Sequence, residues 1–559
     1  MPFTLSPAKL RIEIRRPLTR ITSAGAVGLP PGGIFHLPAG IPLDLDFGRE
    51  YVGSLRFVKQ GNGKLHLRYG EIPEELSCCP EDAACPWYEL PRDTVTENGT
   101  IVIRRRAFRY LRLFSENGEV DLRNLEFRTE EWPLEMRGRF HCSNPRLEQI
   151  WELCRHTIRL CTQDYLEDGV KRDTLLWIGD ARVEAQCLYA LSGDSEPVRR
   201  SLLLMANSQR SDGMIPACCS CGGGNRGADA PYMFPGEAKA PETELTTYCA
   251  DFLSMLKEYY LYSGDRKSAE ELFDTALRQA RYLVRPGWWE PFAGVLLAPE
   301  AKFWNPPEDV INDAASALAA VLCGLKDFLK TAGMLGQTSS VSDIAGRTEQ
   351  LAAILRSRYL DPSDHLLRMP NPEETVNFTG QSFALSGGLI SRREAAAGFT
   401  ALLTGKQPAA FPSDGMSRYR MLKGLFEAGL GNAALHEIEQ CWGFMLDHGA
   451  STTWEKINLY KPDRFLRHLR GSRCHGWSAG PSALFSRFLL GVRIEEPGCG
   501  FLRISPDLYG LDWMDGIFPT PYGDISITAD PRNIRIQAPR GVRIEVPGRQ
   551  SPQQKIFLS

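Results

Sequence analysis

The stretch Ser143-Asn-Pro-Arg-Leu-Glu-Gln-Ile-Trp-Glu-Leu-Cys-Arg-His-Thr-Ile158 decides the fold, because the apolar period changes here from two to about 3.6. Ser143 is a good helix N-cap, and the apolar residues after it share one helical face: Leu147, Ile150, Trp151, Cys154 and Ile158. Helical patterns continue from here almost to residue 490. A large helical domain is therefore predicted.

Short turns join the helical segments in pairs. Ser192-Gly-Asp194 and Ser263-Gly-Asp265 are such turns, since a Gly that ends one helix is followed by an Asp that can cap the next. We predict about twelve helices, near 144–162, 179–193, 196–210, 242–263, 267–284, 308–333, 340–359, 376–388, 391–404, 417–430, 432–446 and 476–490. Hairpins without one dominant repeat favour a closed ring of six, an (α/α)6 barrel, over an open solenoid.

The segments on both sides of the helices read as β structure. Runs such as Lys64-Leu-His-Leu-Arg-Tyr69 and Ile525-Ser-Ile-Thr528 alternate apolar and polar residues, as a half-solvated antiparallel sheet requires. The fold class predicted is multidomain and mainly α. It has an N-terminal β-sandwich or jelly-roll domain at 1–138, the (α/α)6 barrel at 139–491 and a C-terminal β-sandwich at 492–559.

Composition excludes several classes of function. Lys and Arg total 65 against 68 Asp and Glu, so the formal charge of −3 gives no footprint for nucleic acid or an anionic membrane. No signal peptide and no membrane-length apolar run are visible. We therefore expect a cytoplasmic protein with no nucleic-acid or membrane partner; the oligomeric state is left open.

The 15 cysteines raise the question of a metal site. They cluster twice, as Cys78, Cys79 and Cys85, and again at residues 218–221. Neither cluster has two spaced Cys-x-x-Cys pairs or a nearby histidine, so reduced loop thiols are favoured over structural zinc. We expect no metal and no cofactor.

Three long inter-helix segments, at 211–241, 285–307 and 449–475, are rich in Gly, Pro, Trp and acids. Loops of this length are usually functional or disordered, and tryptophans such as Trp304 and Trp454 argue against disorder. An indole can stack on the apolar face of a sugar while carboxylates bind its hydroxyls. An aromatic and acidic rim of this kind predicts a carbohydrate substrate.

The densest polar cluster is Asp168-Gly-Val-Lys-Arg-Asp-Thr-Leu-Leu-Trp-Ile-Gly-Asp180, between the first two predicted helices. Its charges flank an apolar turn instead of following a helical stripe, which favours a functional role over a solvated surface. The alternative is an N-cap with local ion pairs, to which Asp180 and Arg172 could belong.

Two further strings could carry chemistry. In Gly449-Ala-Ser-Thr-Thr-Trp-Glu455, small and β-branched residues hold Glu455 away from the preceding helix, although it could be an ordinary surface acid. In Cys474-His-Gly-Trp-Ser478, His475 opens the last predicted helix and could equally be satisfied by the backbone. No phosphate loop, dinucleotide fingerprint, zinc-protease motif or serine elbow is present.

Taken together, these strings resemble the α-L-rhamnosidases of glycoside hydrolase family 78, in the subgroup written DGxKRDxxxWxGD. The resemblance also covers Asp46-Phe-Gly-Arg-Glu50, Tyr69-Gly-Glu71, Phe108-Arg-Tyr110 and Pro519-Thr-Pro-Tyr-Gly523. It implies that Asp173 is the general acid and Glu455 the general base. It further implies sugar contacts from Asp168, Arg172, Trp177, Asp180 and His475. Asp173 replaces the commoner Glu, and Thr174 replaces the usual Arg.

The residue chemistry agrees with this resemblance. Glycoside hydrolysis needs one carboxylic acid for the leaving oxygen and one carboxylate for water or direct attack. Asp173 has the more apolar neighbours, which suits the acid. We expect an inverting, exo-acting enzyme that removes terminal α-L-rhamnose, or a related sugar, from imported oligosaccharides or glycosides. The alternatives are a polysaccharide lyase or another glycosidase on the same barrel, and a sugar-binding protein that has lost catalysis.

Overall fold

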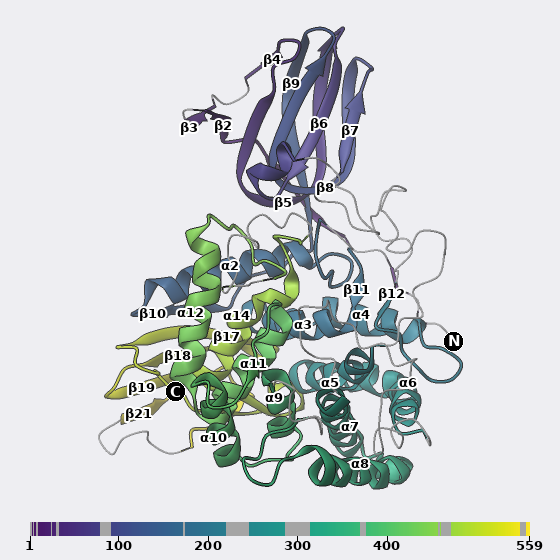
Figure 1. The fold of residues 1–559 in the computed structure, drawn as a ribbon, viewed down its shortest axis with the longest axis vertical. Helices are drawn as coiled ribbons and strands as arrows, with labels where there is room; N and C mark the ends of the chain where they lie inside the picture. The colour runs from purple at the N-terminus through teal and green to yellow at the C-terminus, as the bar shows by residue number, and fades with distance from the viewer. Residues whose placement is uncertain are drawn as a thin grey trace.

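The computed structural model describes residues 3, 5–6, 9–23, 25–29, 33–78, 91–171, 174–219, 245–285, 314–368, 376–456, 459, 471–547 and 555–559. Within these ranges the chain forms β strands first, then helices, then strands again, as the sequence predicts. Figure 1 shows the first group of strands above the helices and the last group beside them.

The N-terminal strands form one nine-stranded sheet with the order β1-β9-β5-β8-β6-β7, to which β2, β3 and β4 are attached. Apolar and polar residues alternate along the strands, so that one face of the sheet is buried. In β6 the buried residues are Leu65, Leu67 and Tyr69. Phe47, Phe108 and Phe127 form an aromatic cluster with ring centroids 4.8–6.1 Å apart. The strands are β1 (Arg11–Arg15), β2 (Thr19–Thr22), β3 (Gly25–Gly28), β4 (Phe35–Leu37), β5 (Leu43–Gly61), β6 (Lys64–Gly70), β7 (Arg92–Val95), β8 (Gly99–Glu116) and β9 (Val120–Glu131).

Each helix predicted from the periodicity has a counterpart in the described residues. Six of them contact one another in a ring, α3 with α5, α5 with α7, α7 with α9, α9 with α11, α11 with α14 and α14 with α3. The helices are α2 (Pro145–Cys161), α3 (Ile178–Leu191), α4 (Glu196–Asn207), α5 (Thr246–Ser263), α6 (Arg266–Leu283), α7 (Ala314–Leu335), α8 (Ser342–Ile354), α9 (Phe378–Ser386), α10 (Arg392–Leu403), α11 (Gly415–Ala428), α12 (Gly431–Asp447) and α14 (Gly480–Leu484).

Two local predictions about the helices are wrong. Asn144, not Ser143, caps α2: its side chain accepts a hydrogen bond of 3.0 Å from the Arg146 amide. Ser143 instead accepts one from the Asp512 amide. The last predicted helix, 476–490, is three pieces, namely the 3₁₀ turn η5 (Gly476–Ala479), α14 and the π turn η6 (Phe485–Leu489). Pro481 has no amide hydrogen and suits only the first turn of a helix, so regular α structure starts there.

The C-terminal strands form a five-stranded sheet, β10-β17-β18-β19-β21, and a three-stranded sheet, β15-β16-β20. Strand β10 (Arg139–Cys142) precedes the helices yet pairs with β17 (Met514–Thr520), which the sequence did not predict. Buried isoleucines of these sheets belong to the same apolar core as the helices, whereas the N-terminal sheet has its own. The remaining strands are β15 (Val492–Glu496), β16 (Phe501–Ile504), β18 (Gly523–Ala529), β19 (Asn533–Gln537), β20 (Arg543–Glu545) and β21 (Lys555–Leu558).

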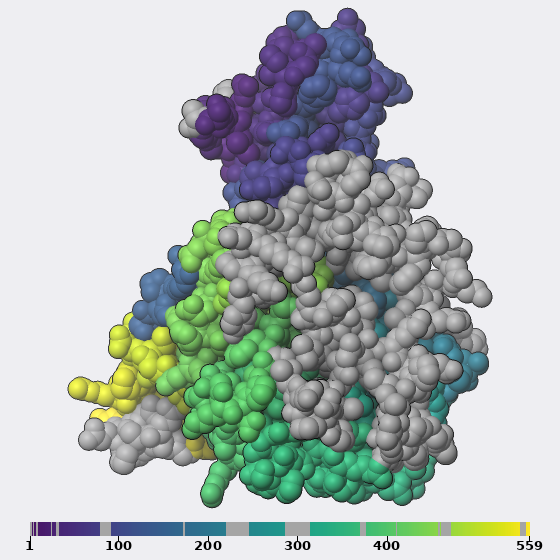
Figure 2. All heavy atoms as spheres, viewed as in Figure 1, coloured from purple at the N-terminus to yellow at the C-terminus, as the bar shows by residue number. Residues whose placement is uncertain are grey.

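The N-terminal sheet forms a lobe of its own above the helices, as Figure 2 shows, and it is bonded to residues of the helical domain. Arg109 makes a two-bond ion pair with Asp46 and donates to the Gly449 carbonyl at 2.9 Å. The Glu50 amide donates to Ser451 Oγ at 3.1 Å. These bonds thus fix the start of segment 449–456. In the described residues no helix is long and apolar enough to cross a membrane.

Candidate active site

Three of the predicted sugar-binding residues, Asp168, Asp180 and His475, meet at one end of the helical ring. Asp180 lies in the first turn of α3, and His475 precedes η5. His475 Nε2 is 3.7 Å from Asp168 Oδ2, and His475 Nδ1 is 3.9 Å from Asp180 Oδ1. Each of the three side chains is at most 4% exposed. The imidazole therefore stands between two buried carboxylates that come from both ends of the motif 168–180.

Asp168 is held by the loop that contains it. Its Oδ1 accepts a hydrogen bond of 3.0 Å from the Leu175 amide, and its own amide donates to the Leu175 carbonyl. Its carbonyl accepts from the Gly476 amide at 2.8 Å. These bonds close the loop on itself and attach it to the segment that carries His475.

Asp180 has a partner that the sequence did not single out. Tyr248, in the first turn of α5, donates a hydrogen bond of 2.9 Å from its hydroxyl to Asp180 Oδ2. Burial and the Asp180 charge raise the pKa of Tyr248 well above its usual value, so the phenol stays a donor. In sequence Tyr248 resembles an ordinary core residue of an amphipathic helix, and no local signal marks it.

The strings that end at Glu455 and begin at Cys474 lie side by side. The His475 amide donates to the Thr453 carbonyl at 2.9 Å, and the Glu455 amide donates to the Ser472 carbonyl at 3.0 Å. Glu455 Oε2 accepts a bond of 2.8 Å from the Ser472 amide. Trp477 Nε1 donates to the Glu455 carbonyl at 3.1 Å. The candidate base thus belongs to the same hydrogen-bonded unit as His475.

Three tryptophans, Trp177, Trp454 and Trp477, lie around this unit. Trp477 stacks on His475 with ring centroids 4.3 Å apart, and Trp177 meets Tyr248 edge-on at 6.0 Å. The Arg473 guanidinium lies over Trp454 at 4.4 Å. Trp177 is 7% exposed and Trp454 3% exposed. In this structure both rings pack against neighbouring side chains and have little surface left open.

The N-terminal lobe supplies acidic residues that brace the site. Lys171, from the motif 168–180, forms ion pairs of 2.5 Å with Glu71 and 2.7 Å with Glu75. Glu71 also accepts from the Arg473 amide at 2.6 Å and from Ser472 Oγ at 3.0 Å. Sequence reasoning assigned Lys171, Glu71 and Glu75 no role, although the string Tyr69-Gly-Glu71 is a signal that could have found one of them.

A buried carboxyl group lies directly beneath the histidine segment. Glu184, one turn after Asp180 on α3, is fully buried, and a Cβ placed on Gly476 would lie 1.9 Å from its Oε1. Among the described residues neither of its oxygens has a hydrogen-bond partner. Burial raises the pKa of Glu184 well above its usual value, which favours the neutral carboxylic acid.

Several predicted positions lie outside the described residues: Arg172, Asp173, Trp304, Cys79, Cys85 and Cys221. Thr174, which follows the candidate acid, has a φ of 53°, a left-handed conformation that is rare for a β-branched residue. In the described ranges no group of three or more His, Cys, Asp or Glu side chains could hold a metal ion.

The ring of helices and the carboxylates at one of its ends define a six-hairpin glycosidase domain. The chain belongs to the family of bacterial α-L-rhamnosidase six-hairpin glycosidase domains, whose model matches residues 135–489. The resemblance inferred from the motifs is confirmed at this level, while the DGxKRD subgroup stays a prediction.

Individual relatives agree with the family. An α-L-rhamnosidase of Alteromonas sp. (strain LOR) is 22% identical over 533 residues, which is 89% of this chain and 55% of that protein. The structure of a GH78 rhamnosidase from Bacillus sp. GL1 has a TM-score of 0.78 and 22% identity, over 96% of this chain and 57% of that one. A Klebsiella oxytoca rhamnosidase with rhamnose bound has a TM-score of 0.73 and 24% identity, over 86% and 96%. The chain thus spans little more than half of the first two relatives.

Proposed function

We propose that this chain is a glycoside hydrolase that removes terminal α-L-rhamnose, or a closely related sugar, from oligosaccharides or glycosides. The observation that carries the proposal is the buried unit of Asp168, Asp180 and His475, which lies beside Glu455 in a domain of the α-L-rhamnosidase family. Carboxylates that are fixed by hydrogen bonds, with an imidazole stacked on Trp477 between them, can bind sugar hydroxyls without reorganising.

The proposed mechanism is an inverting one. Glu455 acts as general base and removes a proton from a water molecule that attacks the anomeric carbon. The hydrogen bond from the Glu455 amide to the Ser472 carbonyl fixes the backbone of the base. The bond from the Ser472 amide to Glu455 Oε2 orients its carboxylate. Asp173 is proposed as the general acid that protonates the leaving oxygen. The account requires the two carboxyl groups to lie about 6.5–9.5 Å apart, which leaves room for the water.

Asp168, Asp180 and His475 are proposed to hold the sugar, together with Arg172. Tyr248 satisfies one Asp180 oxygen, so the other can face His475 and the substrate. Trp177, Trp304 and Trp454 are proposed as apolar walls; for Trp177 and Trp454 this role needs the ring edges to become accessible when substrate binds.

The finer fold is also a proposal. The ring contacts and the helices paired outside them support a closed (α/α)6 barrel, and the flanking sheets support β-sandwich domains at 1–138 and 492–559. A cytoplasmic location stays a prediction of the sequence.

A panel of nitrophenyl glycosides, including the α-L-rhamnoside, tests the function. We expect hydrolysis of the rhamnoside, and a loss of at least about 10²-fold in kcat for Asp173→Asn and Glu455→Gln. Glu349→Gln, an exposed acid on α8, is the matched control and keeps full activity. Smaller losses in the two variants would contradict the assigned roles. Failure on every sugar, with retained sugar binding, would favour the binding-protein alternative, and an unsaturated product would indicate a lyase.

A further inference from the structure

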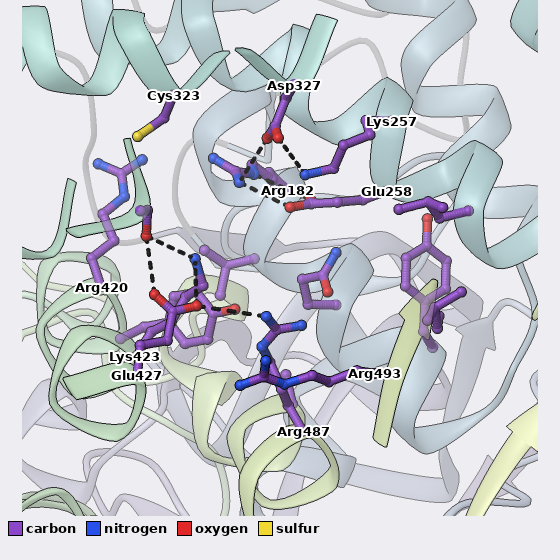
Figure 3. A pocket seen from close by; sticks show the side chains of 18 of the residues that line it. Arg182, Lys257, Glu258, Cys323, Asp327, Arg420, Lys423, Glu427, Arg487 and Arg493 are labelled. Carbon is purple, nitrogen blue, oxygen red and sulfur yellow. Dashed lines mark hydrogen bonds and ion pairs between the residues drawn. The ribbon is translucent and has the colours of Figure 1, made fainter. Parts of the chain in front are cut away.

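A polar cavity of about 440 Å³ lies inside the helical ring, and its lining residues do not include Asp168, Asp180 or Glu455. It extends from the middle of the ring helices to β15, where the C-terminal sheet closes the ring. Its volume is within the range of about 300–1,000 Å³ typical of small-molecule sites. Figure 3 shows charged side chains from different helices pointing into it.

The lining carries more positive than negative charge. Its cations are Arg182, Lys257, Lys326, Lys330, Arg420, Lys423, Arg487 and Arg493, against the acids Asp251, Glu258, Asp327, Glu427 and Glu495. Most of these acids already form ion pairs with lining cations. Asp327 pairs with Lys257 at 2.5 Å and Asp251 with Arg420 at 2.6 Å, and Glu427 serves both Lys423 and Arg487. The surplus cations therefore lack carboxylates of their own.

Two of the lining arginines, Arg487 and Arg493, lie at the β15 side of the cavity. Figure 3 shows Arg487 and Arg493 next to each other. Among the described residues Arg493 makes no ion pair of 4.0 Å or less. Arg493 is an exposed residue of β15, and partial burial of its guanidinium, and then the charge of neighbouring Arg487, lowers its pKa. Two guanidinium groups held together repel each other, and an anion between them would relieve that repulsion.

Several buried polar atoms around the cavity lack hydrogen-bond partners within the described residues. In the described part of the chain, Gln186 Nε2, Tyr189 Oη, Ser486 Oγ and Arg487 Nε are buried without a hydrogen-bond partner, and all four residues line the cavity. Buried polar groups are nearly always hydrogen-bonded in native proteins, so such a concentration indicates a ligand or ordered water. The amide, hydroxyl and guanidinium can each donate to an oxyanion.

We propose that this cavity is a second binding site, independent of the glycosidase chemistry, for a phosphate group, held by Arg487 and Arg493. Arginine is suited to phosphate because its planar donors match two oxygens at once. The cavity is larger than a phosphate ion needs, so both free phosphate and a small phosphorylated sugar fit the chemistry. Gln186, Ser486 and Tyr189 are placed to bind the hydroxyls of the latter.

Isothermal titration of the whole chain with inorganic phosphate and, separately, with a hexose 6-phosphate tests the proposal. We expect saturable binding that is weakened at least tenfold in Arg493→Gln and in Arg487→Gln. Arg532→Gln, at an exposed arginine in the turn between β18 and β19, is the matched control and binds like the wild type. Tighter binding of the ester identifies a phosphorylated sugar as the ligand, and equal binding identifies the free ion.

Two results would overturn the site. One is that neither phosphate compound binds more than sodium chloride does at equal ionic strength. The other is that the arginine variants, with melting temperatures equal to the wild type, bind as tightly as it does. Rhamnoside hydrolysis is measured on the same samples and is expected to stay within twofold, so loss of phosphate binding and loss of the proposed catalysis are distinguishable.

Discussion

Replacing Lys171 by methionine should destabilise the junction between the N-terminal lobe and the site. The ammonium group is 3% exposed and pairs with Glu71 at 2.5 Å and Glu75 at 2.7 Å, both fully or almost fully buried. Methionine fills much of the same space but leaves two buried acids without their cation. Breaking one buried ion pair costs about 3–5 kcal/mol. For a domain of about 350 residues, with an unfolding entropy of about 2.1 cal/mol/K per residue, that corresponds to roughly 4–7 °C in melting temperature.

The stability lost in Lys171→Met should also depend on pH. Burial already raises the pKa of Glu75, and Lys171 opposes this rise. In the variant the folded-state pKa of Glu75 is raised further above its ordinary value of 4.5. A carboxyl with a raised folded pKa contributes stability below its unfolded pKa and loses it as the pH rises through the folded one. Relative to the wild type, Lys171→Met should therefore lose more unfolding free energy at pH 8 than at pH 5.5.

Differential scanning calorimetry at these two pH values measures both effects. Lys64→Met is the control, because Lys64 pairs with Glu116 at 3.4 Å with both side chains more than 40% exposed. An exposed pair contributes about 0–1 kcal/mol. If Lys171→Met melts within about 2 °C of Lys64→Met, or if its deficit does not grow with pH, the bracing role of Lys171 is refuted.

Three further predictions concern the residues around His475. Tyr248→Phe removes the hydrogen bond to Asp180 and should lower kcat/KM on a rhamnoside at least about tenfold, since a bond to a charged group contributes about 1.5–3 kcal/mol. An unchanged kcat/KM would show that Asp180 does not need this hydrogen bond. Glu184→Gln cannot ionise at this position. Above pH 4.5 its unfolding free energy should therefore fall less steeply with pH than that of the wild type, by up to ~1.4 kcal/mol per pH unit. Parallel profiles from urea titrations would contradict a raised pKa for Glu184. Gly476→Ala places a methyl group 1.9 Å from Glu184 Oε1 and should abolish activity or folding, whereas Gly333→Ala, with open space around it, should be neutral or stabilising in thermal melts.

The helices were predictable because their signals are local. Apolar periodicity, Gly-Asp turns and capping residues act within a few positions, so the order of elements follows from the sequence. Pairs that are distant in the chain carry no such signal. Strand β10 pairs with β17 across the whole helical domain, and only the folded chain brings Arg139 opposite Ile517. The mixed helix at 476–489 likewise reflects its contacts with α2, α3 and α11 more than its own propensity.

In the candidate site, too, local sequence signals were predictive and contacts between distant residues were not. The charge pattern of residues 168–180 is informative by itself and predicted a site that includes Asp168 and Asp180. His475 and Glu455 were added through the family resemblance, and the structure brings both close to that segment. The residues that hold these side chains in place come from distant parts of the sequence. Tyr248 sits in a helix where a tyrosine is ordinary, and Glu71 lies in another lobe, so neither role could be inferred without the packing.

The central claim is that Glu455 activates a water molecule that attacks a terminal α-L-rhamnoside from the face opposite the leaving group. Proton NMR of the first minutes of hydrolysis of 4-nitrophenyl α-L-rhamnoside tests it directly, because the two anomers of free rhamnose have separate signals and interconvert slowly. The account predicts that β-L-rhamnose forms first and then equilibrates. Formation of the α anomer first, or no release of rhamnose at all, would contradict it.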